Sequence, residues 1–203
     1  MEYILFANII SMVIGLFNSF LLPKYLSIDT YAIVKTYNLY ITYANIFCFG
    51  YNEGMYLKYG GKNIETIDKK ELSINFINFF YLEIATFLVV LTFSVVLNNF
   101  ILGAFALGMF SLNIITYLKS LYQATGEFSE YGKALNYEKI GIFILNVVLM
   151  FILNSDSYLL YIAVQVIVEF FVGCYLLIKT KNQIKLPIIL KYDRAVIKNN
   201  IQD

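Results

Sequence analysis

The chain has 203 residues, of which 60% are hydrophobic and only 14% are charged, and its formal net charge is +1. So low a charged fraction excludes a disordered chain and argues against a water-soluble globule, since soluble domains are about one quarter charged. The lack of a basic excess argues against a nucleic-acid partner. With no histidine and two isolated cysteines, we expect no metal, no other cofactor and no enzymatic activity. The composition indicates an all-α membrane protein of several spans.

The apolar segments predict six transmembrane helices, each long enough to cross a hydrocarbon core of about 30 Å. The first has no basic leader and no small-residue cleavage site, so we expect it to be retained. The expected helices cover residues 3–23, 30–56, 72–97, 100–122, 134–153 and 158–178. They make up one transmembrane lobe over residues 1–180, followed by a cytoplasmic amphipathic linker over 181–203 that Pro187 interrupts.

The basic residues are distributed unevenly between the connections, which predicts the orientation. Thirteen of the fifteen lie in or beside the connections after helices 2, 4 and 6, whereas the alternate connections hold only Lys24. Cytoplasmic loops carry the excess of lysine and arginine, so both termini are predicted to be cytoplasmic. The thirteen are Lys58, Lys62, Lys69, Lys70, Lys119, Lys133, Lys139, Lys179, Lys181, Lys185, Lys191, Arg194 and Lys198.

Polar residues gather on one side of each of the first two helices, at helical spacing. A polar group in hydrocarbon must be paired or face water, so these arcs either form interhelical hydrogen bonds or line a water-filled cavity. We favour a cavity for these two helices, and plain packing for the shorter stripes on the fourth and sixth. The first arc comprises Asn8, Ser11, Gly15, Asn18 and Ser19, and the second Tyr31, Lys35, Asn38, Thr42, Asn45 and Asn52.

Ionisable residues inside the spans are costly and therefore mark functional positions. Lys35 either extends to the headgroups or faces the cavity, where its charge suits a phosphate. Glu83 and Glu169 lie deeper, and are protonated, paired or part of a proton or cation relay. Gly50 and Gly54 form a G-x-x-x-G step, which is typical of close helix packing.

Several segments resemble the Wzx-type polysaccharide and O-antigen flippases of the multidrug/oligosaccharidyl-lipid/polysaccharide exporter superfamily. A first helix ends in LLPKYL, the second opens at Tyr31, and the Gly50-x-x-x-Gly54 step leads into YLKYG. LYQATGEFSEYGKALNYEKI resembles an inner loop of that family, and IKLPIILKYDRAVIKNNI resembles the linker before a seventh helix.

The resemblance implies transport of an undecaprenyl-diphosphate-linked oligosaccharide across the bacterial inner membrane, for cell-surface polysaccharide biosynthesis. Two six-helix lobes would alternate access to a central cavity, whose cationic residues bind the diphosphate. Lys35 and Lys24 occupy corresponding positions, whereas the sole arginine, Arg194, lies in the tail, unlike arginine-rich family cavities. The substrate-binding residues expected on this basis are Lys35, Asn38, Thr42, Asn45, Asn8, Ser11 and Asn18.

Family members have two lobes, so we expect this chain to be a fragment or truncated product, or two copies to pair. The implied partners are membrane lipid, the lipid-linked glycan, a C-terminal lobe or second copy, and the polysaccharide polymerase machinery. One alternative is a cation-coupled exporter of small molecules, with Glu83 or Glu169 as the coupling acid. Another is a membrane interaction subunit that transports nothing, or an inactive remnant.

Overall fold

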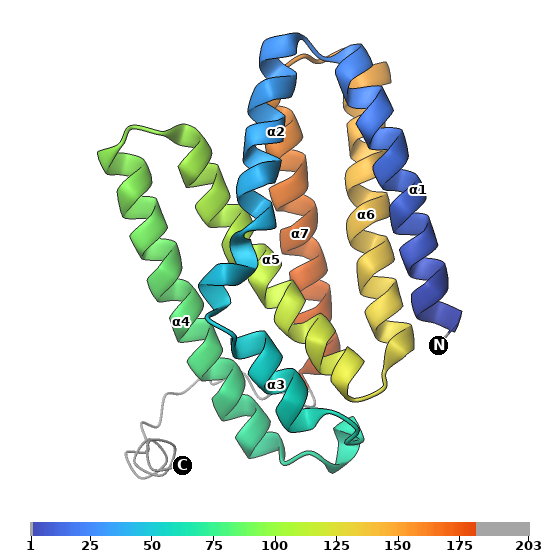
Figure 1. Ribbon diagram of the computed structural model, residues 1–203, viewed down its shortest axis with the longest axis vertical. Coiled ribbons are helices and arrows are strands. Elements are labelled where there is room, and N and C mark those ends of the chain that lie inside the picture. Colours follow the sequence, from blue (N-terminus) through green and yellow to red (C-terminus); the bar gives the residue numbers. More distant parts are fainter. Residues whose placement is uncertain (1, 182–203) are drawn as a thin grey trace.

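The computed structural model describes residues 2–181, and within that range the chain is all-α (Figure 1). The predicted linker beyond Lys181 lies outside the described residues. The helices are α1 (Glu2–Tyr25), α2 (Ile28–Thr42), η1 (Ala44–Cys48), α3 (Tyr51–Tyr59), η2 (Ile64–Thr66), α4 (Lys69–Val96), α5 (Phe100–Ala124), α6 (Phe128–Phe151) and α7 (Tyr158–Thr180).

Five of these helices, α1 and α4 to α7, are long and apolar enough to cross a membrane. Large apolar side chains cover their outer faces, and Phe20, Val95 and Phe171 each expose more than 60% of their surface. A water-soluble protein rarely exposes so continuous an apolar surface, whereas lipid tails solvate it well. The chain is therefore an all-α polytopic membrane protein.

The tight turn expected at Asn98–Asn99 is confirmed. Asn98 has a left-handed backbone, with a φ of 48°. Asn99 caps α5, because its side-chain oxygen accepts hydrogen bonds from the backbone N–H groups of Ile101 at 3.0 Å and Leu102 at 3.3 Å. The first, third, fourth and sixth predicted helices all agree with the structure to within a few residues at each end.

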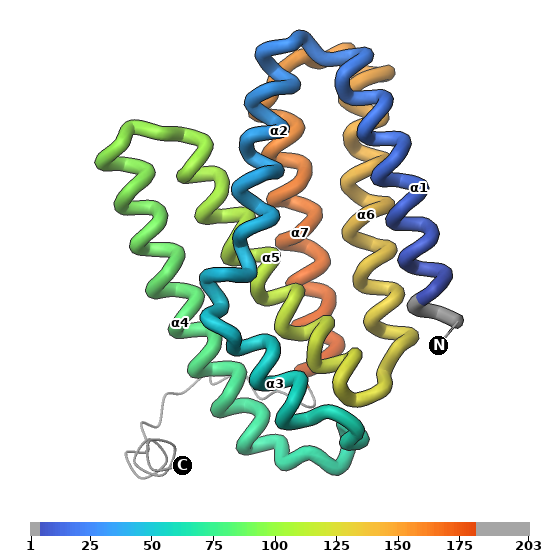
Figure 2. The backbone as a smooth tube through the Cα atoms, viewed as in Figure 1, coloured from blue at the N-terminus to red at the C-terminus, as the bar shows by residue number. Residues whose placement is uncertain are grey.

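The second predicted helix, expected to run unbroken over residues 30–56, is interrupted, and that prediction is wrong. The α-helix ends at Thr42, continues as the short 3₁₀-helix η1, and resumes only at Tyr51. Figure 2 shows the kink in the tube where α2 passes through η1 into α3, while the whole segment still runs the length of the bundle. The second predicted span is thus a discontinuous helix, and neither α2 nor α3 is among the described helices that are long and apolar enough to cross a membrane.

Two consecutive left-handed residues separate the halves of this span. Phe49 has a φ of 49° and Gly50 a φ of 77°, a region that favours glycine. A Cβ atom added at Gly50 or at Gly54 would meet no atom within 4 Å. Within the described chain the glycine pair therefore makes no close helix contact, contrary to the packing role expected for it, and Gly50 instead forms the break.

The fifth predicted helix starts earlier than expected, at Phe128 rather than at residue 134. Gly126, with a φ of 80°, makes the turn, and an ion pair between Glu130 and Lys133 supports the first helical turns. The polar residues of this segment therefore belong to the first turns of a helix and not to a loop. Lys119 and Lys139, assigned above to this connection, therefore lie within α5 and α6.

Helix α5 is the centre of the fold. It contacts α2, α3, α4, α6 and α7, and it is the most buried of the five long helices, whereas α1 contacts mainly α6 (Figure 1). Gly108 of α5 allows a close approach of α2, because a Cβ atom there would collide with the Tyr37 hydroxyl and Ile41. This arrangement leaves α1 and α6 as one pair of helices facing α2 and α7.

Candidate functional site

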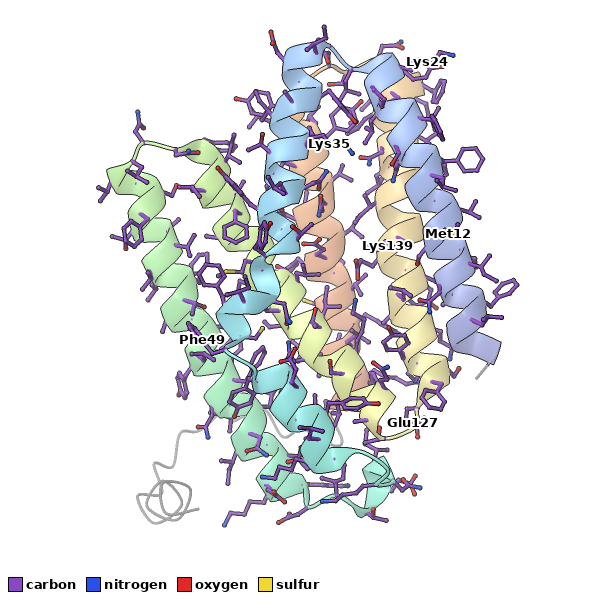
Figure 3. All side chains as sticks on the ribbon, viewed as in Figure 1. Met12, Lys24, Lys35, Phe49, Glu127 and Lys139 are labelled. Carbon is purple, nitrogen blue, oxygen red and sulfur yellow. The ribbon has the colours of Figure 1, made fainter. Side chains whose placement is uncertain are left out.

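A polar cavity of about 250 Å³ lies between α1, α2, α6 and α7. All four helices contribute polar side chains to its wall. Figure 3 shows Lys35 on α2 and Lys139 on α6, on opposite sides of this space. The polar lining residues are Ser11, Asn18 and Ser19 of α1, Lys35 and Asn38 of α2, Lys139 and Asn146 of α6, and Tyr161 and Gln165 of α7.

Four of the seven predicted substrate-binding residues, Ser11, Asn18, Lys35 and Asn38, line this cavity together. Most of the first polar arc and two residues of the second thus face one shared space. The Ser11 hydroxyl and the Asn18 side-chain oxygen have no hydrogen-bond partner within the described part of the chain. Both groups are therefore buried polar atoms that the described protein itself does not satisfy.

The other three, Asn8, Thr42 and Asn45, do not line the cavity. Asn8 is exposed nearer the start of α1. Thr42 ends α2 and donates its hydroxyl hydrogen to the Leu39 carbonyl at 2.6 Å. Asn45 belongs to η1, where the helical register that would align it with Lys35 is lost. Lys24 also lies outside the cavity, over the ring of Tyr25.

Sequence reasoning missed the wall that α6 supplies. Lys139 and Asn146 lie two turns apart on one face of α6, with Ile142 between them, and all three line the cavity. Their spacing of three and four residues is a helical signal that could have identified them. Gln165 of α7 also lines the cavity, although its stripe was expected only to pack.

A buried carboxylate holds Lys139 at the cavity wall. Glu138 Oε1 lies 2.7 Å from Lys139 Nζ, and Glu138 Oε2 lies 3.0 Å from Lys119 Nζ. The Glu138 side chain is only 3% exposed and that of Lys119 is 14% exposed, so this pair lies largely out of water, whereas the Lys139 side chain is 42% exposed. Two lysines share one carboxylate, which leaves one of their positive charges uncompensated by Glu138.

Lys35 adds a second source of positive charge on the opposite wall. It forms no ion pair with any described acidic residue, and its ammonium lies 5.4 Å from the ring centroid of Tyr31. An exposed lysine without a described counter-ion can attract an anion. The cavity therefore combines surplus positive charge with the amides of Asn18, Asn38, Asn146 and Gln165.

A clasp of hydrogen bonds joins the α1–α2 turn to the α6–α7 turn. The Ser27 backbone N–H donates to Asp156 Oδ1 at 2.8 Å, and the Thr30 hydroxyl donates to the Asp156 carbonyl at 2.8 Å. Asp156 lies in the α6–α7 turn, outside the spans. The hydrogen bonds from Ser27 stabilise its ionised form and lower the pKa of its carboxyl.

The two possible coupling acids belong to separate polar clusters. Glu169 of α7 adjoins the cavity, because Gln165 Nε2 donates to its Oε1 at 3.2 Å, while its Oε2 is buried without a partner among the described residues. Glu83 of α4 lies instead at the break in the second span, where Asn113 Nδ2 donates to it at 3.0 Å. Only Glu169 is therefore placed to act at the cavity.

The fold and the cavity define a class: a polytopic α-helical membrane protein with a discontinuous span and a basic, amide-lined cavity. Comparison with family models, with curated proteins and with solved structures gave no match.

Proposed function

We propose that this chain is one lobe of a transporter that carries a lipid-linked, diphosphate-containing oligosaccharide across the bacterial inner membrane, with both termini cytoplasmic. The observation that supports this most is the pair of lysines, Lys35 and Lys139, on opposite walls of a membrane-embedded cavity. Two ammonium groups on facing helices suit a ligand with two adjacent phosphates, each of which offers charged oxygens.

The remaining lining residues suit the other parts of such a ligand. The side-chain amides of Asn18, Asn38, Asn146 and Gln165 both donate and accept hydrogen bonds, as sugar hydroxyls require. The lipid tail needs no protein pocket, since it can stay in the surrounding bilayer. A second lobe, from further sequence or from a second copy, would supply the opposite side of the transport path.

Binding of undecaprenyl diphosphate to the full chain in lipid nanodiscs tests the anion site. Replacing Lys35 or Lys139 by Gln removes a charge-assisted hydrogen bond, worth about 1.5–3 kcal/mol, so each variant is expected to bind at least about tenfold more weakly. Lys70→Gln is the matched control, because Lys70 is exposed outside the cavity and this variant should bind like the wild type. Equal binding by all three variants would refute the proposal.

A cation-coupled exporter of small molecules is a second candidate, favoured by the unpaired carboxyl oxygen of Glu169 beside the cavity. In that case Glu169→Gln abolishes transport driven by a cation gradient, while Lys35→Gln retains it. If the chain is instead a flippase lobe, Lys35→Gln should lose transport. Transport assays of the two variants therefore separate the candidates.

A further inference from the structure

The break in the second span is occupied by a second polar cluster, distinct from the cavity. Asn113 of α5 donates through Nδ2 both to the Ala44 carbonyl of η1, at 3.2 Å, and to Glu83 Oε2 of α4, at 3.0 Å. Because α2 has already ended at Thr42, the Ala44 carbonyl is available to a side chain. One amide thus connects the break to a carboxyl group on a neighbouring helix.

Glu83 is buried without compensation for a negative charge. Its side chain is 0% exposed and that of Asn113 is 1% exposed. Among the described residues, Glu83 Oε1 is buried without a nitrogen or oxygen partner, the carboxyl has the thiol of Cys48 as a weak hydrogen-bonding neighbour, and no lysine or arginine forms an ion pair with Glu83. An isolated buried carboxylate costs several kcal/mol, and a proton on the unpartnered oxygen removes that charge.

The other titratable groups around Glu83 add no positive charge. The thiol of Cys48 in η1 lies beside the carboxyl, and from α3 and α5 the nearest phenols, Tyr51 and Tyr117, pack on Phe79 one turn away. The acidic group on α3 is Glu53, whose Oε1 accepts a hydrogen bond from Nδ2 of Asn45 in η1 at 3.3 Å. The ionisable neighbours named here, all within the described residues, are neutral or acidic, which favours the protonated carboxyl.

A chain of polar groups runs from the surface of the bundle to this carboxyl. Glu53 and Asn45 are exposed, and Asn45 Oδ1 accepts a hydrogen bond from the buried Asn52 at 2.9 Å. Asn52 Nδ2 also lies 3.3 Å from the sulfur of Cys48, which adjoins Glu83. These groups form a polar connection between the exposed side of η1 and Glu83.

We propose that Glu83 is a proton-binding site that controls the break in the second span. With the proton bound, the neutral carboxyl packs against Asn113 and η1 and the break is closed. When the proton leaves to water, the buried anion must be hydrated, and the backbone that yields is η1 with its left-handed residues Phe49 and Gly50. Such 3₁₀ segments within a span commonly act as hinges.

The two native cysteines provide a direct test. Replacing Cys174 by Ser leaves Cys48 as the single thiol, next to Glu83. The full chain in lipid nanodiscs is treated with N-ethylmaleimide over a range of about pH 5 to 9, which spans the range over which perturbed carboxyls titrate. Thiolate formation itself speeds the reaction as pH rises, so the comparison is with Glu83→Gln in the same background.

Across this pH range, we expect the alkylation rate of Cys48 to rise about tenfold more in the wild type than in Glu83→Gln. A tenfold difference is the change expected when opening of the break is linked to the loss of one proton over one pH unit. Glu71→Gln is the matched control, because Glu71 is an exposed acid on the same helix, paired with Lys58 at 2.6 Å. It should follow the wild-type profile. Parallel profiles for the wild type and Glu83→Gln would overturn the proposal.

Hydrogen exchange of the wild type checks the same inference without any substitution. After correction for base-catalysed exchange, the protection of the amides over residues 44–50 should fall as pH rises, while that of α5 stays constant. Constant protection over residues 44–50 would refute the proton-controlled break. Neither experiment contains a glycan or a diphosphate, so their outcome is independent of the flippase proposal.

Discussion

At the scale of single residues, Glu138 has the greatest effect on the electrostatics of the cavity. It is the shared counter-ion of Lys119 and Lys139, and its side chain is almost fully buried. A lysine in such a place would otherwise lose its charge or leave the helix interface. Glu138 is therefore best described as a positioning residue for Lys139.

Glu138→Gln is expected to be strongly destabilising, because it leaves two lysines with no buried counter-ion. Breaking a buried ion pair costs about 3–5 kcal/mol, so the melting temperature in nanodiscs should fall sharply. Glu71→Gln provides the comparison, since the exposed Lys58–Glu71 pair contributes about 0–1 kcal/mol. Similar melting temperatures for the two variants would contradict the assignment of Glu138.

The Asp156 clasp predicts a pH dependence of stability. Its pKa is lower in the folded chain than in the unfolded chain, because of the hydrogen bonds from Ser27. The stabilisation is therefore complete above the unfolded value of about 3.9 and is lost as pH falls through the lower, folded value. Wild type should melt above Asp156→Asn at neutral pH, with the gap closing below about pH 4.

The clasp can be separated from general acid unfolding by a control on the surface. Glu65→Gln removes an exposed acid in η2, far along the chain from Asp156, and should leave the melting profile close to that of the wild type. If the wild type and Asp156→Asn differ equally at neutral and acidic pH, then the charge of Asp156 does not stabilise the clasp.

At the scale of elements, the glycines of the second span separate two interpretations of the same motif. A helix-packing step requires both glycines, whereas a helix break requires only Gly50, whose φ of 77° suits no other residue well. Gly54 lies within α3 and has open space around it. The structure therefore assigns them unequal roles.

Gly50→Ala should cost about 1 kcal/mol or more, because alanine is strained in the left-handed region. Gly54→Ala should instead be neutral or stabilising by up to about 1 kcal/mol, since alanine is the better helix former and meets no neighbour. Thermal unfolding of the two variants measures the difference. Equal destabilisation by both would restore the packing interpretation.

At the scale of the whole molecule, long apolar runs allowed most of the spans to be predicted, since hydrocarbon thickness fixes their length. The break was not predicted, because the segment around Phe49 and Gly50 has the composition of a continuous polar-faced helix.

Half of the cavity was predicted from helical periodicity on α1 and α2. The other half depends on Lys139, which shares the carboxylate of Glu138 with Lys119 of another helix, and this three-residue cluster is a tertiary property.

The topology predicts that the turns at the two ends of α4 lie on opposite sides of the membrane. Reporter fusions after Lys69 and after Asn98 should give opposite compartment signals, with Lys69 cytoplasmic, because the lysine-rich connections remain inside. Fusions after Asn154, in the α6–α7 turn, should report the same side as Asn98. An external Lys69 would refute the orientation.

The pairing of α1 with α6 has a consequence for biosynthesis. Helix α1 is made first, yet its main partner in the fold is a helix that leaves the ribosome only after α2 to α5. During translation α1 must therefore reside in lipid as an independent span. Until α6 arrives, the polar groups of Asn18 and Ser11 form their hydrogen bonds with water or with the insertion machinery. Arrival of α6 then removes these side chains from lipid and forms the cavity wall in the same step.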